Sequence, residues 1–213
     1  MVYGAVMRYF KKSKTMVFPR EIIVGHKTTE QIAELCNRIT TGNSALIVAD
    51  KKTKKLSGNN IQKILKKAGY TVNEKLVSSA TVHQVNKVIN YANKNESNLM
   101  IGVGGGTVID VTKLAAYELK NPFISVPTSA AHDGIASPRA SLKHSKGSVS
   151  KTAVSPLAIL ADTDIIHTAP YRMLASGCAD VISNISAVMD WELAHRLKDE
   201  EFSSHAAVLA KTA

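Results

Sequence analysis

Four short apolar runs recur within the first 126 residues, and segments with helical periodicity separate them. The runs are IIVG at residues 22–25, ALIVA at 45–49, LMIGV at 99–103 and FISV at 123–126. Strands that are buried on both faces read as continuous apolar runs, and their alternation with helices is typical of βαβ units. The sequence therefore predicts an α/β fold built on a Rossmann-like parallel sheet.

Polar residues at the ends of these segments predict where helices begin. Thr28 and Gln31 have the spacing of a capping box, and Ser57 and Thr81 are placed to open two further helices. Residues 129–150 are rich in small and polar side chains, so we expect turns and loops there.

After Ala169 the alternation stops, and apolar residues recur with helical spacing through PYRMLASGCADVISNISAVMDWELAHRL and EEFSSHAAVLAKTA. One or two helices cannot enclose a core. The sequence also ends at Ala213 inside this pattern, without a capping residue. We therefore expect one domain over residues 1–162 and the beginning of an incomplete helical domain over residues 163–213.

Composition argues against membrane and nucleic-acid proteins. No apolar stretch reaches the roughly 18 residues that a membrane span needs. The N-terminal MVYGAVMRYFKKSK does not place basic residues before an apolar core as a signal peptide does, so the expected location is the cytoplasm. The net charge is +10, but no aromatic stacking residues lie among the lysines at 51, 52, 54 and 55, so we expect no specific nucleic-acid site.

A glycine-rich turn is the strongest local motif. Gly102-Val103-Gly104-Gly105-Gly106-Thr107 follows an apolar run and precedes the helical run VIDVTKLAAYEL. Glycines permit positive φ and close approach of the backbone to a phosphate, and a helix N-terminus offers free amides. We predict a pyrophosphate site here, with Thr107 as helix cap or phosphate ligand. A tight strand-to-helix turn is the alternative, although such a turn does not require three consecutive glycines.

Two carboxylates accompany this turn. Asp110, expected in the first turn of the helix, either stabilises the helix N-terminus or binds the ligand. Asp50 ends the ALIVA run, where it is placed to accept the ribose hydroxyls of a dinucleotide, although Lys51 and Lys52 equally favour a 2′-phosphate. NAD and NADP both remain open.

A second candidate region is PFISVPTSAAHDGIASPRASL, at residues 122–142, where a strand runs into a loop. Ligands bind at the carboxyl ends of parallel strands. Thr128, Ser129 and Ser137 are candidates to bind a cofactor, and Asp133 is a candidate to bind a substrate hydroxyl. Ordinary Asp-Gly and Ser/Thr turns explain any one of these residues taken alone.

The segments GVGGGTVIDVTKLAA, VPTSAAHDGIASPRAS and ASGCADVISN, in this order and spacing, resemble archaeal-type sn-glycerol-1-phosphate dehydrogenases. These enzymes belong with glycerol dehydrogenases, iron-type alcohol dehydrogenases and dehydroquinate synthases, and the resemblance covers nearly the whole chain. It implies that Asp133 binds substrate and that Asp180 ligates zinc and contacts the substrate. The residues that it implies for the dinucleotide are Gly106, Thr107, Val108, Ile109, Asp110, Thr128, Ser129, Ala130, Ala131 and Ser137.

The resemblance further implies an oxidoreductase that reduces dihydroxyacetone phosphate to sn-glycerol 1-phosphate with NADH or NADPH, in archaeal phospholipid biosynthesis. Zinc would act as a Lewis acid at the ketone, and a homo-oligomer is usual. The resemblance implies two histidine ligands well downstream of Asp180, so they are expected beyond residue 213. His195 is not expected to replace them, because it would lie roughly 22 Å from Asp180 on one helix, at about 1.5 Å per residue. The alternatives are a polyol dehydrogenase that acts on glycerol and a non-catalytic nucleotide-binding fragment.

Overall fold

The computed structural model describes residues 17–145 and 147–212. The N-terminal segment, on which the expected location partly depends, lies outside these residues. The chain forms two compact units, of which the larger is Phe18–Asp180 and the smaller includes the chain from Val181 onward. This division falls inside a long helix, whereas the change of sequence pattern lies near Asp162. The assignment of residues 163–213 to a second domain stays a prediction.

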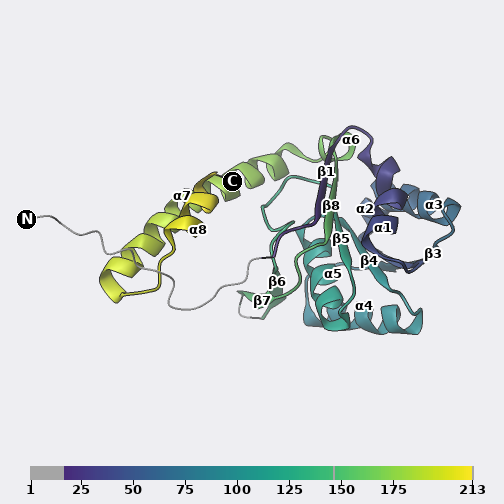
Figure 1. The fold of residues 1–213 in the computed structure, drawn as a ribbon, viewed down its shortest axis with the longest axis horizontal. Coiled ribbons are helices and arrows are strands. Elements are labelled where there is room, and N and C mark those ends of the chain that lie inside the picture. Colours follow the sequence, from purple (N-terminus) through teal and green to yellow (C-terminus); the bar gives the residue numbers. More distant parts are fainter. Residues whose placement is uncertain (1–16, 146, 213) are drawn as a thin grey trace, which may run out of the picture. The chain divides into compact units, whose positions relative to one another are not determined.

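A six-stranded parallel sheet forms the centre of the larger unit, with the order β1-β8-β5-β4-β2-β3 (Figure 1). The predicted α/β fold is confirmed, and so are the four predicted strands, now β1, β2, β4 and β5. Two further strands were not predicted from the sequence: β3, a half-exposed edge strand rich in polar residues, and β8, a short alanine-rich strand. The strands are β1 Glu21–Gly25, β2 Ser44–Ala49, β3 Thr71–Leu76, β4 Leu99–Gly104, β5 Phe123–Pro127 and β8 Ala158–Asp162.

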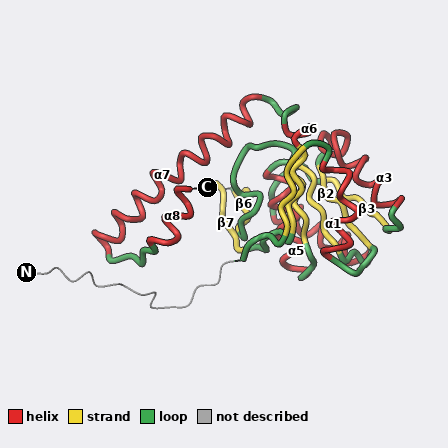
Figure 2. Tube along the Cα trace, turned by 45° about the horizontal axis from the view of Figure 1, so that its top comes forward, coloured by secondary structure: helices red, strands yellow, loops and turns green. Residues whose placement is uncertain are grey.

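Helices cover both faces of this sheet (Figure 2). Successive side chains of β2 point to opposite faces of the sheet. Leu46 and Val48 pack in the core cluster beneath α4 and α5, whereas Ala45 and Ile47 pack in the cluster beneath α1 and α3. The helices of this unit are η1 Thr28–Gln31, α1 Ile32–Ile39, α2 Lys51–Thr53, η2 Lys54–Gly58, α3 Asn59–Lys67, α4 Val82–Lys94, α5 Gly106–Leu119 and α6 Thr163–Ile166.

The capping box predicted at Thr28 and Gln31 is wrong. The short 3-10 helix η1 begins after Lys27, which adopts a left-handed conformation with φ 51°, and no side chain of the segment caps it. The carboxylate of Asp162, at the end of β8, instead accepts a hydrogen bond of 2.9 Å from the Thr29 N–H. A carboxylate from the neighbouring parallel strand has replaced the local cap.

Ser57 does not open a helix, which corrects a second prediction. The helix begins six residues earlier, at Lys51, and Ser57 lies buried inside a π-helical turn. Asp50 is the N-cap, and its Oδ1 accepts hydrogen bonds from the N–H groups of Lys52 (2.7 Å) and Thr53 (2.9 Å). The helix predicted to begin after Thr81 is confirmed as α4, with the Thr81 hydroxyl oxygen accepting from the Gln84 N–H at 3.4 Å.

An antiparallel hairpin stands where the sequence predicted only turns and loops. Its strands are β6 Arg139–His144 and β7 Gly147–Thr152. The two segments are mostly polar because only Ala140 and Leu142 point into the core, where they join the cluster that includes α5. An alternation limited to two apolar residues is too short to distinguish a strand from a loop by sequence.

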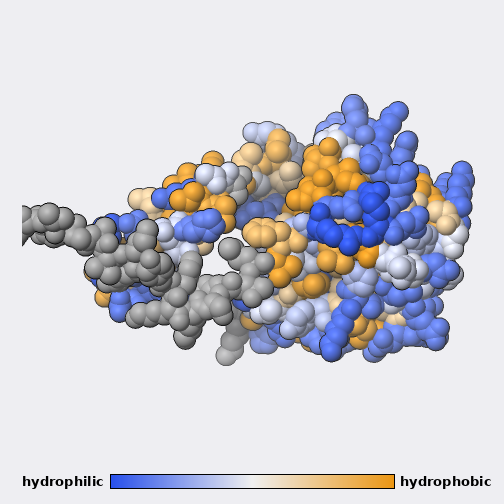
Figure 3. All heavy atoms as spheres, viewed as in Figure 1, coloured by the Kyte–Doolittle hydropathy of each residue, from blue (hydrophilic) through white to orange (hydrophobic). Residues whose placement is uncertain are grey.

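The helices predicted after Ala169 are confirmed as α7, Tyr171–Lys198, and α8, Ser204–Thr212. Within the smaller unit the Trp191 and Phe202 rings lie 4.7 Å apart between centroids, and the indole N–H of Trp191 donates to the Glu201 carbonyl. Apolar side chains are exposed along β1 and along α7 (Figure 3). Among the described residues, no helix combines the length and the apolar character needed to cross a bilayer.

Asp162 gives a test of this fold. Burial raises the pKa of its carboxyl, but hydrogen bonds from Thr29 and from the Asp164 N–H outweigh burial and hold the pKa below the usual value. We expect Asp162→Ala to lower the free energy of unfolding by about 1–3 kcal/mol at pH 7. Urea denaturation measures this loss, and Asp190→Ala, at an exposed helix position, is the matched control.

The pH dependence of that loss has a defined sign. A carboxyl group with a lowered folded-state pKa stabilises the protein fully above its unfolded-state pKa. This stabilisation disappears as the pH falls through the folded-state pKa, so the gap between wild type and Asp162→Ala should narrow in acid. A gap that stays constant down to acid unfolding would contradict this role for the carboxylate.

Candidate nucleotide-binding site

The predicted site residues gather at the carboxyl edge of the sheet. β4 ends at Gly104 beside Pro127 of β5, and the Thr128 N–H donates to the Gly104 carbonyl at 3.2 Å. The chain leaves β2 towards α3 on one face of the sheet and leaves β4 towards α5 on the other. The connections therefore diverge between β2 and β4, and such a switch point is where doubly wound α/β folds bind ligands.

The glycine turn does not use positive φ, contrary to part of the sequence argument. Gly105 has an extended backbone with φ −84° and ψ −170°. Two of the glycines pack closely instead, Gly104 against the base of the Val108 side chain and Gly106 against the end of the His132 side chain. A Cβ on Gly104 would lie 2.7 Å from the Val108 Cβ, and one on Gly106 would lie 2.7 Å from Nε2 of His132.

Gly105 differs from its two neighbours because the chain itself leaves room for a side chain there. The nearest atom to a Cβ on Gly105 is the Ser129 Oγ, at 3.7 Å, which is ordinary contact. This space lies beside the first turn of α5, where the N–H groups of Gly106 and Thr107 have no carbonyl one turn earlier to bond. A phosphate group fits such a cradle because it needs both open space and unpaired amides.

The remaining residues of the turn contribute through the backbone. Gly105 is the N-cap of α5 and no side chain caps this helix, so the prediction that Thr107 caps it is wrong. The side chains of Val108 and Ile109 are fully buried in the core, and their N–H groups both bond to the Gly105 carbonyl. Val108 and Ile109 therefore fix the shape of the turn from its core side.

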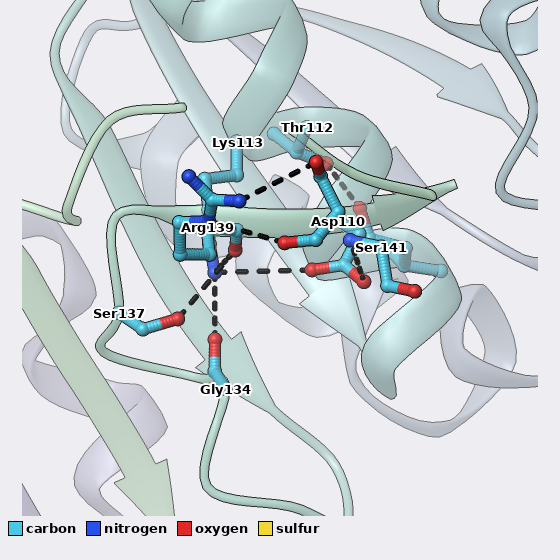
Figure 4. A network of polar contacts seen from close by, with 9 residues as sticks. Asp110, Thr112, Lys113, Gly134, Ser137, Arg139 and Ser141 are labelled. Carbon is cyan, nitrogen blue, oxygen red and sulfur yellow. Dashed lines mark hydrogen bonds and ion pairs between the residues drawn. The ribbon is translucent and has the colours of Figure 1, made fainter. Parts of the chain in front are cut away.

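Asp110 faces the hairpin and lies past the first turn of α5, contrary to the prediction. One carboxylate oxygen accepts from the Ser141 N–H of β6 at 3.1 Å, and the other lies 3.8 Å from the Lys113 ammonium (Figure 4). Burial raises the pKa of Asp110, while the bond from Ser141 and the charge of Lys113 oppose this shift. Asp110 therefore joins α5 to β6.

Lys113 was missed by the sequence analysis. Its side chain is fully buried, and its ammonium donates to the carbonyls of Gly134 (2.6 Å) and Arg139 (2.8 Å). Burial lowers the pKa of Lys113, and the charge of Asp110 opposes that shift. The available signal was the spacing of Asp110 and Lys113 by three residues within an otherwise apolar helix.

The loop after β5 places its predicted residues around the glycine turn. Thr128 and Ser129 are buried, Ala131 and Ser137 are half-buried, and the Ser137 hydroxyl lies 3.5 Å from the Arg139 carbonyl. Ala130 is exposed. At this point α7 approaches so closely that a Cβ on Gly177 would overlap the Ala130 carbonyl oxygen.

This close approach brings together the two predicted substrate residues. The Asp133 N–H donates to Oδ2 of Asp180 at 2.9 Å, although the two residues are 47 positions apart in the sequence. Asp133 is exposed and Asp180 is half-buried. The side chain of Asp180 therefore contacts the backbone of Asp133, which lies in the loop that borders the glycine turn.

The zinc site implied by the resemblance is not formed by these residues. In the part of the chain that the structure describes, no three His, Cys, Asp or Glu side chains gather as a metal site would require. His195 lies on the same helix as Asp180, but its Nδ1 contacts the Glu200 carbonyl at 2.5 Å and its ring stacks on Phe202. Asp180 offers one carboxylate ligand.

Comparison with known proteins identifies the family. Residues 23–170 match the model of the iron-containing alcohol dehydrogenases, and the chain belongs to that family. It is 46% identical over 201 residues to the glycerol-1-phosphate dehydrogenase (NAD(P)+) of Methanosarcina barkeri, and 44% identical over 202 residues to that of Thermoplasma volcanium. These matches cover 94% and 95% of this chain but only 56% and 57% of the relatives, so the chain spans about half their length.

Solved structures agree with this assignment of the fold. A glycerol dehydrogenase from Schizosaccharomyces pombe superposes with a TM-score of 0.76 at 26% identity, covering 82% of this chain and 45% of that one. An iron-containing alcohol dehydrogenase from Thermotoga maritima gives a TM-score of 0.71 at 20% identity, covering 80% and 54%.

The different roles of the glycines are testable by stability. We expect Gly104→Ala to lower the free energy of unfolding by about 1–3 kcal/mol, because its Cβ would overlap Val108. Gly105→Ala should change it by less than about 0.5 kcal/mol, because its Cβ meets open space. Thermal unfolding of the two variants provides the measurement, and equal losses would show that Gly105 is also fixed by packing.

Proposed function

We propose that this chain is the coenzyme-binding part of a glycerol-1-phosphate dehydrogenase, which reduces dihydroxyacetone phosphate to sn-glycerol 1-phosphate with NADH or NADPH. The observation that carries the proposal is the open cradle at Gly105, beside unpaired amides of α5 and at the switch point of the sheet. The names of the relatives that are 42–46% identical support glycerol 1-phosphate as the alcohol and NAD or NADP as the coenzyme.

The coenzyme would bind across this edge through backbone and short side chains. The N–H groups of Gly106 and Thr107 would receive the pyrophosphate, with the Ser129 hydroxyl on the opposite side. Asp50 would accept the adenosine ribose hydroxyls through Oδ2, because its Oδ1 already caps α2. The bound coenzyme supplies a hydride to the substrate carbonyl.

The substrate would lie between the coenzyme and the Asp133–Asp180 pair. The hydrogen bond from the Asp133 N–H to the Asp180 carboxylate holds these two residues together, and their carboxylates would accept hydrogen bonds from a substrate hydroxyl. The excess of basic residues, with a net charge of +10, favours the approach of a dianionic substrate.

We propose a zinc ion only for an enzyme of the full length of the relatives. Asp180 would provide one ligand, and the described residues provide no full ligand set, so we derive no catalytic step through a metal. We further propose that the complete enzyme acts in the cytoplasm, in phospholipid biosynthesis, as a homo-oligomer. A non-catalytic nucleotide-binding module is the second candidate for the 213-residue chain, and zinc content and turnover distinguish the two.

Coenzyme binding is tested by a substitution that the fold should tolerate. Gly105→Val adds a branched side chain to the open cradle, and its extended backbone accepts valine without strain. We expect calorimetry to show at least about a tenfold loss of NADH affinity with little change in the unfolding temperature. Unchanged NADH affinity would contradict the proposal that the pyrophosphate binds at this turn.

Catalysis requires a complete enzyme, made by joining residues 1–213 to the segment that follows the matched region in the Methanosarcina barkeri relative. We expect the short chain to bind NADH without oxidising it in the presence of dihydroxyacetone phosphate, and the joined protein to do both. In the joined protein Asp180→Ala should lose zinc and turnover together. NADH affinity should fall much less than turnover, because the role proposed for Asp180 is at the substrate and the metal rather than at the coenzyme.

Asp133→Ala in the joined protein should raise the KM for dihydroxyacetone phosphate while zinc content is kept. Turnover of unphosphorylated dihydroxyacetone at the same efficiency would favour the polyol dehydrogenase. Steady NADH oxidation by the short chain with one equivalent of zinc would contradict the requirement for further metal ligands.

A further inference from the structure

Lys113 carries a buried charge that the proposed chemistry does not use. Its ammonium group lies beneath the loop between β5 and β6 and donates to the carbonyls of Gly134 and Arg139 (Figure 4). Burying a lysine charge is unfavourable unless hydrogen bonds and opposite charges compensate it. The compensating groups here are two backbone carbonyls of the loop region and the Asp110 carboxylate at 3.8 Å.

The two ends of this loop are fixed in other ways. At the start, the Thr128 N–H bonds to the Gly104 carbonyl of β4. At the end, the Pro138 carbonyl accepts from the Ala153 N–H at 2.9 Å, where the hairpin begins. Residues 129–138 contain no helix or strand, so the middle of the loop depends on contacts from its surroundings.

Lys113 supplies such contacts next to both predicted ligand-binding side chains. Gly134, whose carbonyl it binds, directly follows Asp133. The second carbonyl that Lys113 binds, that of Arg139, also lies 3.5 Å from the Ser137 hydroxyl. The carboxylate of Asp133 is close enough to favour the charged form of Lys113 and so acts on its pKa. Asp133 and Ser137 therefore share the same buried amine as a support.

We propose that Lys113 is a positioning residue, which fixes the middle of the loop so that Asp133 and Ser137 face the coenzyme and substrate. This inference rests on the proposed function. It assigns Lys113 no contact with either ligand. The beginning of the loop, at Thr128 and Ser129, keeps its own anchor on β4 and does not depend on Lys113.

The coenzyme would contact two regions, the glycine turn with Asp50 and the middle of the loop, and a different probe reports on each. ADP reaches the glycine turn and the Asp50 end of the site. NADH also needs the loop, through Ser137. We expect wild type to bind NADH more tightly than ADP by calorimetry. In Lys113→Met, which keeps the chain length of the side chain but removes its donors, NADH affinity should fall about tenfold and ADP affinity should stay within about twofold.

Lys94→Met is the matched control, because Lys94 is exposed at the end of α4. It should leave both affinities within about twofold of wild type. Equal losses of ADP and NADH affinity in Lys113→Met would mean general damage to the domain and would overturn the positioning role. Unchanged NADH affinity in that variant would overturn it as well.

A second measurement uses the wild-type protein, so it remains informative if Lys113→Met does not fold. The side-chain nitrogen of Lys113 gives a ¹⁵N resonance that reports on its hydrogen bonds. Saturating NADH should shift this resonance as the loop engages, and saturating ADP should not. The absence of a shift with bound NADH would overturn the proposal.

These outcomes distinguish the inference from the proposed function. If wild type binds neither ADP nor NADH, the coenzyme site itself is wrong and the inference falls with it. If wild type binds both with equal affinity, the coenzyme site stands but the loop adds nothing, and only the role of Lys113 is lost.

Discussion

The buried ammonium group of Lys113 connects the three segments that surround the candidate coenzyme site. It extends from α5, binds the carbonyls of Gly134 and Arg139, and lies near Asp110, which in turn accepts a hydrogen bond from β6. Loss of this group would leave two partly buried carbonyls without their donor, which is more costly than the loss of a fully exposed hydrogen bond. The helix, the loop and the hairpin are thus coupled through one side chain.

Close backbone approach is the second constraint around the site. Gly104 and Gly106 let the turn pack against Val108 and His132, and Gly177 lets α7 pack against the Ala130 carbonyl. At Gly104 and Gly177 a Cβ would meet the Val108 Cβ and a backbone carbonyl, so these two positions exclude a side chain for reasons internal to the protein. Gly105 is surrounded by these tight contacts but is itself open, and that contrast separates the space for a ligand from the packing that shapes it.

The fold was predictable to the extent that burial leaves a continuous apolar run. The strands β1, β2, β4 and β5 were identified in this way, whereas β3 and the β6–β7 hairpin were not, because half-exposed strands carry too few apolar residues to show a period. The fully buried β8 was also not predicted, because its apolar run is short and rich in alanine. Local capping was less reliable. Thr81 caps α4 as its sequence indicates, but the donor groups of η1 bond to Asp162, which lies 133 residues away from Thr29.

The sequence by itself determined the alternation of strands and helices, the glycine turn and the family, since these depend on residue types at short spacings. Only the tertiary structure decided what the polar residues near the turn do. Asp110 was equally suited by sequence to a ligand or to a helix end, yet it binds Ser141. Lys113 is spaced three residues from Asp110, but this spacing does not reveal that its ammonium binds two carbonyls of the loop region. Asp133 and Asp180 came together only because α7 returns to the loop across 47 residues. Hydrogen bonds between distant segments depend on the packing of the whole domain, which no local pattern encodes.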